Sequence, residues 1–462
     1  MSYDELSDFV QATAAEFGLP GVAAGVRATG QEVCACHGVT STENPLPVDR
    51  DTVFALGSVT KTYTATALMR LVADGRVELD APVRRYVPEL MLSEERAAAA
   101  ITVMNLLNHT SGLGVRLIVE TGDGDDALAR YVAKLPKLSL VAPPGERASY
   151  SQAGYNLLGR IIEKVTGLTY ERAIASLLLE PLGLSHSFFA AQDVMTRRFA
   201  VGHNPGEDGT LAIARQWKDT RGNNPGGGLA SSVADQLLWA RFHLGDGRTE
   251  GGARVLPAEV LQRMKEPTVE LKGSTLGDAF GICWFLRDVD GVRTVGHGGS
   301  GNGQFAELLT VPERDFAVVV MSNAGPDGVA CNQAIVRWAL ENYLGVVDRD
   351  PEPLPYDEAR AREVVGSYDI DVMTLTIGTD GARMTLAVGI KPEIRAASDS
   401  EMPADYAAAA IGLLPGDGDE YIVTEGGLKG QRGFFTRDQD RAVVGVDVAG
   451  RRFNRVPTTS AP

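Results

Sequence analysis

The segment Phe54–Tyr63 reads F-A-L-G-S-V-T-K-T-Y and places Ser58 and Lys61 three residues apart at the predicted start of a helix. Side chains at that spacing share one face of a helix. A serine hydroxyl is a weak nucleophile unless an adjacent base takes its proton, and a lysine does so when burial or neighbouring charge keeps it neutral. S-x-x-K by itself is weak evidence, because a chain of this length contains about one match by chance. A helix-capping serine beside an exposed lysine would give the same pattern.

Two more clusters carry groups suited to acyl transfer. P-P-G-E-R-A-S-Y-S-Q places Tyr150 just before an amphipathic helix, and a tyrosine can shuttle protons when a cation such as Lys61 stabilises its phenolate. T-V-G-H-G-G-S-G lies between two predicted strands, and the two glycines after His297 let a backbone come close to a ligand. The N–H of Ser300 can then help to bind an oxyanion. The structural alternatives are a capping loop with a packed tyrosine and a glycine turn.

The order, spacing and flanks of the three clusters are far more specific than any one of them. The flanking stretches are L-D-A-P-V-R-R-Y-V-P-E-L at 79–90, I-T-V-M-N-L-L-N-H-T-S-G-L at 101–113 and P-G-G-G-L-A-S-S-V-A-D at 225–235. Together they resemble the serine β-lactamase and penicillin-binding protein (DD-peptidase) superfamily, and its class C branch in particular, over about residues 5–345.

The resemblance implies a role for each matching position. Ser58 would be the nucleophile, Lys61 its activator and Tyr150 the general acid/base, while the backbone amides of Ser58 and Ser300 would form the oxyanion hole. The implied substrate-binding residues are Gln152, His297, Gly298 and Gly299. His109, within N-H-T-S-G-L, corresponds to a structural position with a hydrogen-bonding role.

Two positions depart from the family's motifs. Gln152 stands where the Y-x-N motif has asparagine, which keeps an amide but lengthens its reach. His297 stands where the K-T-G motif has lysine, as in some DD-peptidases, aminopeptidases and esterases of the superfamily. Loss of that permanent cation weakens the case for binding a β-lactam carboxylate.

The hydrophobic pattern predicts an α/β chain. We expect a helix over 3–17, a hairpin with arms at 22–28 and 32–39, mostly helices over 59–271, strands at 281–287, 293–296, 305–311 and 317–322, and a helix over 329–343. The economical arrangement is one antiparallel sheet built from both ends of this region, flanked by the terminal helices, beside an α-helical subdomain.

A second domain is expected after a linker. V-V-D-R-D-P-E-P-L-P-Y-D-E begins at Val346, and its three prolines and five acids fit an extended connection. We place a β-lactamase-like catalytic domain at 1–347, the linker at 348–356 and a C-terminal domain at 357–462. Short β-like runs at 373–377, 384–388, 421–424 and 442–448 predict a small β-barrel or sandwich in that last part.

Composition excludes several classes of partner. The formal charge of −16 and the lack of a Lys/Arg run argue against nucleic acid. No apolar stretch reaches the roughly 20 residues of a membrane span. The N-terminus carries Asp4, Glu5 and Asp8 where a secretory signal is basic and then apolar, so a cytoplasmic location is expected. The six histidines and four cysteines suggest neither a metal site nor a disulfide framework, and no cofactor is expected. The oligomeric state is not readable.

The predicted activity is hydrolysis of small-molecule esters or amides through an acyl-enzyme. A cytoplasmic location favours small metabolites over cell-wall peptides. The alternative is a transacylase that moves the acyl group to an amine or alcohol in secondary metabolism. A third hypothesis is an acylated sensor or binding module without turnover, and the complete set of Ser58, Lys61 and Tyr150 argues against it.

Overall fold

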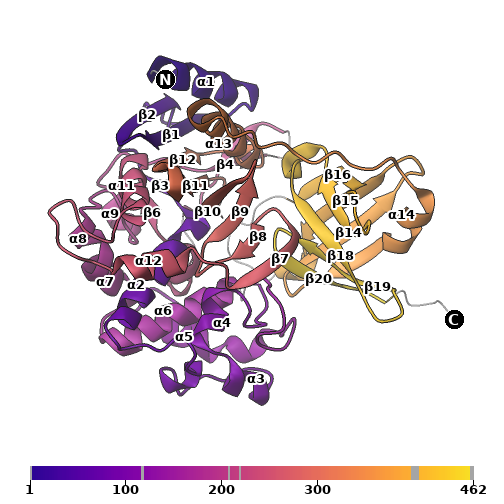
Figure 1. Ribbon diagram of the computed structural model, residues 1–462, viewed down its shortest axis with the longest axis horizontal. Coiled ribbons are helices and arrows are strands. Elements are labelled where there is room, and N and C mark those ends of the chain that lie inside the picture. Colours follow the sequence, from indigo (N-terminus) through magenta and orange to yellow (C-terminus); the bar gives the residue numbers. More distant parts are fainter. Residues whose placement is uncertain (1–2, 116–118, 207–208, 218–219, 397–404, 458–462) are drawn as a thin grey trace.

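An eight-stranded antiparallel sheet forms the centre of the larger domain (Figure 1). The computed structural model describes residues 3–115, 119–206, 209–217, 220–396 and 405–457. In spatial order the strands are β2 (Gln31–Gly38), β1 (Gly21–Ala28), β12 (Phe316–Ser322), β11 (Phe305–Val311), β10 (Val292–Ser300), β9 (Phe285–Val289), β8 (Gly277–Phe280) and β7 (Val269–Ser274). The two ends of the domain thus meet in one sheet, as the sequence predicts.

The pairing of β1 with β12 joins the beginning and end of this domain. Ala23 lies opposite Met321, and their side chains enter the core on the side of the helical region. Ala24 lies opposite Val320, and this pair packs toward α1 (Tyr3–Glu16) and α13 (Gly328–Leu344). β12 is buried on both faces, which explains its unbroken apolar run. Figure 1 shows α1 and α13 on one side of the sheet and the helical region on the other.

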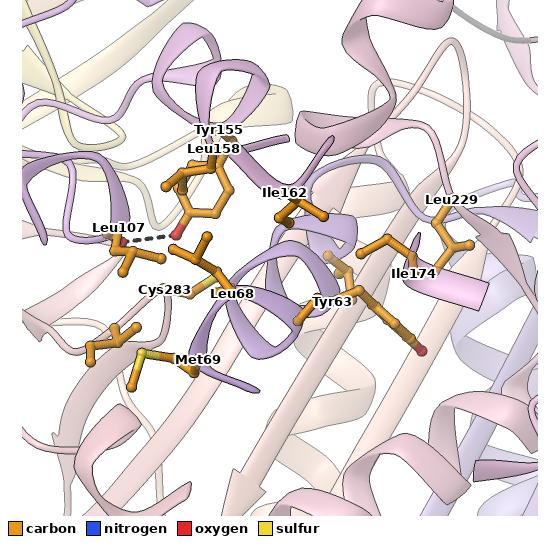
Figure 2. Close-up of a cluster of buried hydrophobic side chains, with 14 of the residues drawn as sticks. Tyr63, Leu68, Met69, Leu107, Tyr155, Leu158, Ile162, Ile174, Leu229 and Cys283 are labelled. Atoms are coloured by element: carbon orange, nitrogen blue, oxygen red, sulfur yellow. Dashed lines mark hydrogen bonds between the residues drawn. The ribbon is translucent and has the colours of Figure 1, made fainter. Parts of the chain in front are cut away.

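The helical region is built around α2 (Thr60–Ala73), the helix that follows Ser58. The other helices are α3 (Glu95–Ala100), α4 (Val103–Leu107), α5 (Ala127–Ala133), α6 (Gln152–Thr166), α7 (Tyr170–Ile174), α8 (Glu180–Leu182), α9 (Ala191–Val194), α10 (Asn224–Gly227), α11 (Val233–Leu244) and α12 (Ala258–Met264). Figure 2 shows the buried side chains that pack around α2, including Leu68, Leu158 and Ile162. Tyr63 stacks on Trp239 with 3.9 Å between ring centroids. This packing fixes the position of α2 and therefore of the serine at its start.

Four features differ from the sequence-based expectation. β7 and β8 come earlier than the predicted strands. Two small two-stranded sheets were also not predicted: β3 (Phe54–Ala55) pairs with β6 (Ala230–Ser231), and β4 (His203–Pro205) pairs with β5 (Leu211–Ile213). The strand predicted from 281 begins only at Phe285, because Cys283 adopts a left-handed conformation (φ 75°) that interrupts the extended backbone. β10 continues through the glycines to Ser300.

The C-terminal domain is a closed antiparallel barrel, which resolves the choice between barrel and sandwich. Its strands are β13 (Gly366–Asp369), β14 (Met373–Thr379), β15 (Met384–Ile390), β16 (Tyr406–Leu413), β17 (Glu420–Val423), β18 (Arg432–Arg437), β19 (Val443–Val448) and β20 (Arg451–Arg455), with α14 (Glu358–Val364) and α15 (Pro392–Ala396). Side chains such as Tyr368, Leu386 and Phe435 are buried in its core. The barrel lies against β7, the edge strand of the central sheet (Figure 1), where Arg432 donates to the carbonyl of Ser274 at 3.4 Å.

Among the described residues, no helix has the length and apolar character needed to cross a membrane. The same part of the chain holds no group of three or more histidine, cysteine or acidic side chains placed to bind a metal ion.

Candidate active site

Ser58 and Lys61 lie together at the junction between a short 3-10 turn, Gly57–Val59, and α2. The Lys61 Nζ atom is 3.0 Å from the Ser58 Oγ atom. Lys61 is fully buried, and a buried lysine this close to a hydroxyl can exchange a proton with it. The structure therefore places the serine and the lysine of the S-x-x-K motif side by side.

The Lys61 amine is surrounded by hydrogen-bond acceptors. Besides Ser58, it donates to the side-chain carbonyl of Gln152 and, at 2.7 Å, to the backbone carbonyl of Gly226. An ammonium group has three N–H donors, so these three acceptors match its charged form. The site is therefore suited to hold the ammonium that forms when a neutral Lys61 takes the Ser58 proton.

Tyr150 lies beside this pair, just before α6. The Lys61 Nζ atom is 4.9 Å from the centroid of its ring. Burial raises the pKa of Tyr150, while a hydrogen bond with Ser58 and the positive charge of Arg451 partly oppose that rise. The phenol is consequently neutral at physiological pH, and it can donate a proton once a negative charge or a leaving group forms beside it.

His297 occupies the wall of the site on β10. Its ring stacks on Phe285 with 4.2 Å between centroids, and its Nδ1 atom lies 2.6 Å from the Gly298 carbonyl oxygen. Burial and then the charge of Lys61 lower the pKa of His297 to about 3. The imidazole is therefore neutral, so this position supplies no fixed positive charge to a substrate.

The backbone segments that carry Ser58 and Ser300 lie close together, which two glycines make possible. A Cβ atom on Gly57 would lie 2.6 Å from the Ser300 nitrogen, and one on Gly299 would lie 2.9 Å from the Ser58 nitrogen. Gly57 also has a left-handed conformation, with φ at 51°. This proximity is compatible with the oxyanion hole expected from the sequence, whose two N–H donors must lie near one oxygen.

Both ends of the Gln152 side-chain amide form hydrogen bonds with other protein groups. Its carbonyl accepts from Lys61, and its NH2 group donates to the side-chain oxygen of Asn223 at 2.8 Å. Asn156 donates to the same oxygen at 3.1 Å. The substrate contact expected of Gln152 stays a prediction, whereas its contact with Lys61 is observed.

His109 has the structural role that the sequence suggested. Its Nδ1 atom accepts a hydrogen bond from the Ser151 backbone N–H at 3.1 Å, and its carbonyl accepts from the N–H of Ser149 at 2.8 Å. Its ring centroid is 4.4 Å from that of Tyr150. His109 therefore fixes the backbone on both sides of the tyrosine.

Sequence reasoning missed three contributors to the site: Asn223, Gly226 and Arg451. The first two lie in or next to the P-G-G-G stretch, whose position in the family pattern was a usable signal. Arg451 comes from the barrel, and its guanidinium carbon lies 5.0 Å from the Tyr150 ring centroid. Nothing local in the sequence connects it to a tyrosine some 300 positions earlier.

Comparison with known proteins bears on the family and the fold. A family model described as Beta-lactamase matches residues 6–340. Penicillin-binding protein 4 of Amycolatopsis lactamdurans is 35% identical over 363 residues, which cover 77% of this chain and 94% of that protein. The solved structure of SurE with D-Leu aligns with a TM-score of 0.72 at 24% identity, covering 98% of this chain and 99% of the other. A class C β-lactamase aligns at 0.63 and 21% identity, covering 74% of this chain and 96% of the other.

Proposed function

The chain belongs to the β-lactamase family, whose chemistry is serine acyl transfer, and from this premise we propose that it forms an acyl-enzyme at Ser58 and hydrolyses small-molecule esters or amides. The observation that carries the proposal is the 3.0 Å contact between Lys61 Nζ and Ser58 Oγ beside a buried, neutral Tyr150. Each of these groups has a chemical task in the two-step reaction.

In the first step the Ser58 Oγ atom attacks the substrate carbonyl carbon. The Lys61 amine, which is neutral before the attack, takes the Ser58 proton, and the new oxyanion accepts hydrogen bonds from the backbone amides of Ser58 and Ser300. The bond to the leaving group breaks as Tyr150 donates a proton to its nitrogen or oxygen, and the Lys61 ammonium returns a proton to the phenolate. Water then attacks the acyl-enzyme, and the proton transfers run in the opposite direction to release the acid and restore Ser58.

The substrate lies, in this proposal, along the edge of β10 from His297 to Gly299. β9 pairs with β10 only from Val292 to Gly296, so it leaves the edge beyond that point free. The glycines allow a substrate amide or ester to approach the backbone closely. The neutral imidazole of His297 supports substrates without a carboxylate at this point, rather than β-lactams that need a fixed cation there.

A second candidate function is transacylation to an amine or alcohol. The observation that favours it is that the barrel lies directly over Tyr150, which is only 4% exposed. A covered acyl-enzyme meets less water, and this gives an acceptor bound in the site an advantage over hydrolysis.

The test is intact-protein mass spectrometry after incubation with a fluorophosphonate and with a panel of activated esters, comparing the wild type with Ser58→Ala. We expect one covalent adduct per chain in the wild type and none in the variant. Equal labelling of both proteins would refute Ser58 as the nucleophile.

The same esters incubated with and without amines and alcohols then separate the two functions. D-Leucine belongs among these acceptors because SurE, a structural neighbour, was solved with it. New amide or ester products would support transacylation, and an unchanged acid product across all acceptors would support hydrolysis.

A further inference from the structure

The barrel holds the backbone of Tyr150 directly. The N–H of Tyr150 donates a hydrogen bond of 2.8 Å to the carbonyl of Gly450, which lies in the turn between β19 and β20. This turn packs against the turn between β7 and β8, since a Cβ atom on Gly450 would lie 2.4 Å from a Leu276 methyl group. A part of the second domain thus contacts the segment that carries the proposed acid/base.

A buried ion pair joins the same two segments. The Arg147 guanidinium lies 2.7 Å from the Asp447 carboxylate, and the two side chains are 18% and 7% exposed. On the barrel side, the Tyr421 hydroxyl donates to the Asp447 carbonyl at 2.8 Å. Because Tyr421 is itself buried in the barrel core, this hydrogen bond ties the backbone of Asp447 to that core.

The segment that leads to Tyr150 has little structure of its own. Residues 143–150 form neither helix nor strand, so their position depends on individual contacts. Gly145 N–H donates to Thr110 at 2.7 Å, and Ser149 N–H donates to His109 at 2.8 Å. Arg147 lies between these points and three residues before Tyr150, within about 11 Å of chain. The ion pair between Arg147 and the barrel therefore helps to set the position of the Tyr150 phenol.

We propose that Asp447 is a positioning residue for Tyr150, so that the docked barrel is part of the catalytic apparatus. Through Arg147 it fixes the approach of the 143–150 segment, and the adjacent Gly450 carbonyl fixes the tyrosine backbone. This inference rests on the proposed acyl-transfer function. Asp447 does not touch the reacting atoms; it acts through the segment that carries Tyr150.

The chain offers a matched control for this idea. Lys272 on β7 and Asp417 in the barrel form a second ion pair between the domains at 2.6 Å, but their side chains are 46% and 52% exposed. An exposed pair of this kind contributes little, and it touches no part of the segment that leads to Tyr150. Asp447→Asn and Lys272→Gln each remove one charge from a domain contact, and only the first is expected to affect Tyr150.

The experiment measures the rate of Ser58 labelling by a fluorophosphonate, and kcat and KM for an activated ester, in the full-length chain. We expect Asp447→Asn to lower the labelling rate and kcat by about tenfold to a hundredfold, as for a catalytic group displaced by about 1 Å. KM should change less than about twofold, and Lys272→Gln should behave as wild type. Arg147→Met should reproduce the loss, and the double variant should be no worse than either single one, because the pair acts as a unit.

The results also distinguish this inference from the proposed function. Wild-type rates in Asp447→Asn, with Ser58 labelled normally, would overturn the positioning role and leave the acyl-enzyme proposal intact. Absence of labelling in the wild type would overturn both. If Asp447→Asn does not fold, as judged by circular dichroism and thermal unfolding, Arg147→Lys replaces it. That substitution keeps the charge, shortens the reach and lies outside the barrel, and wild-type rates in it would equally overturn the inference.

Discussion

Replacement of Gly299 by alanine is the sharpest test of the oxyanion hole. A Cβ atom at this position would lie 2.0 Å from the Leu56 carbonyl oxygen and 2.9 Å from the Ser58 nitrogen. Close carbon–oxygen contacts in proteins are about 3.3 Å or longer. The strand and the turn that carries Ser58 must therefore separate by more than about 1 Å. Both partners are backbone atoms, so a side-chain rotation cannot relieve the contact.

The cost of that separation follows from the geometry of oxyanion binding. Donors work when they lie about 2.7–3.1 Å from the oxyanion, and a shift of more than about 1 Å removes one of the two amides from that range. Loss of one donor costs about a hundredfold to a thousandfold in rate, or about 2.7–4 kcal/mol. We expect a loss of this size in acylation for Gly299→Ala, with a smaller effect on the affinity for substrate.

Gly301→Ala supplies the control, because a Cβ atom there would meet Ala55 at an ordinary 3.7 Å. The assay is the rate of fluorophosphonate labelling of Ser58 together with the burst of leaving group from an activated ester. Thermal unfolding of both variants checks that the fold is retained. If Gly299→Ala acylates within about twofold of Gly301→Ala, the two amides do not form the oxyanion hole.

Other groups in the site yield three further predictions. Tyr150→Phe keeps the ring contact with His109 but lacks the hydroxyl, so we expect stopped-flow acylation to slow by about 10²–10⁴-fold with little change in melting temperature. Gln152→Ala and Asn223→Ala should each slow acylation, and a double-mutant cycle should show the losses to be non-additive, since both residues support Lys61 through one hydrogen-bonded chain. His297 has a pKa of about 3 when folded and about 6.5 when unfolded, so the unfolded chain alone binds this proton between those values. The contribution of His297 to the free energy of unfolding is complete above pH 6.5 and falls by about 1.4 kcal/mol per pH unit as pH drops toward 3. In urea unfolding from pH 7 to pH 4, the free energy of unfolding of His297→Asn should therefore depend less steeply on pH than that of the wild type. An equal slope in the two proteins would contradict this assignment.

The strand pattern shows where sequence reasoning fails for physical reasons. Apolar alternation predicts a strand from 281, yet Cys283 takes a left-handed turn and donates its backbone N–H to the Leu107 carbonyl at 3.2 Å. A contact with a distant helix thus overrides the local preference. β12, by contrast, has an apolar run long enough to identify it directly, because it is buried on both faces.

The sequence by itself determined the chemistry that local spacing can encode. Ser58 and Lys61 share a face because they lie one helical turn apart. The glycines around His297 indicate that two backbone segments approach each other closely. Only the tertiary structure decided that the barrel closes, that its β19–β20 turn reaches Tyr150, and that Asp447 pairs with Arg147. Such contacts depend on how the surfaces of two folded domains fit together. Surface fit leaves no periodic signal in either segment, whereas helix and strand geometry repeat along the chain and can be read from it.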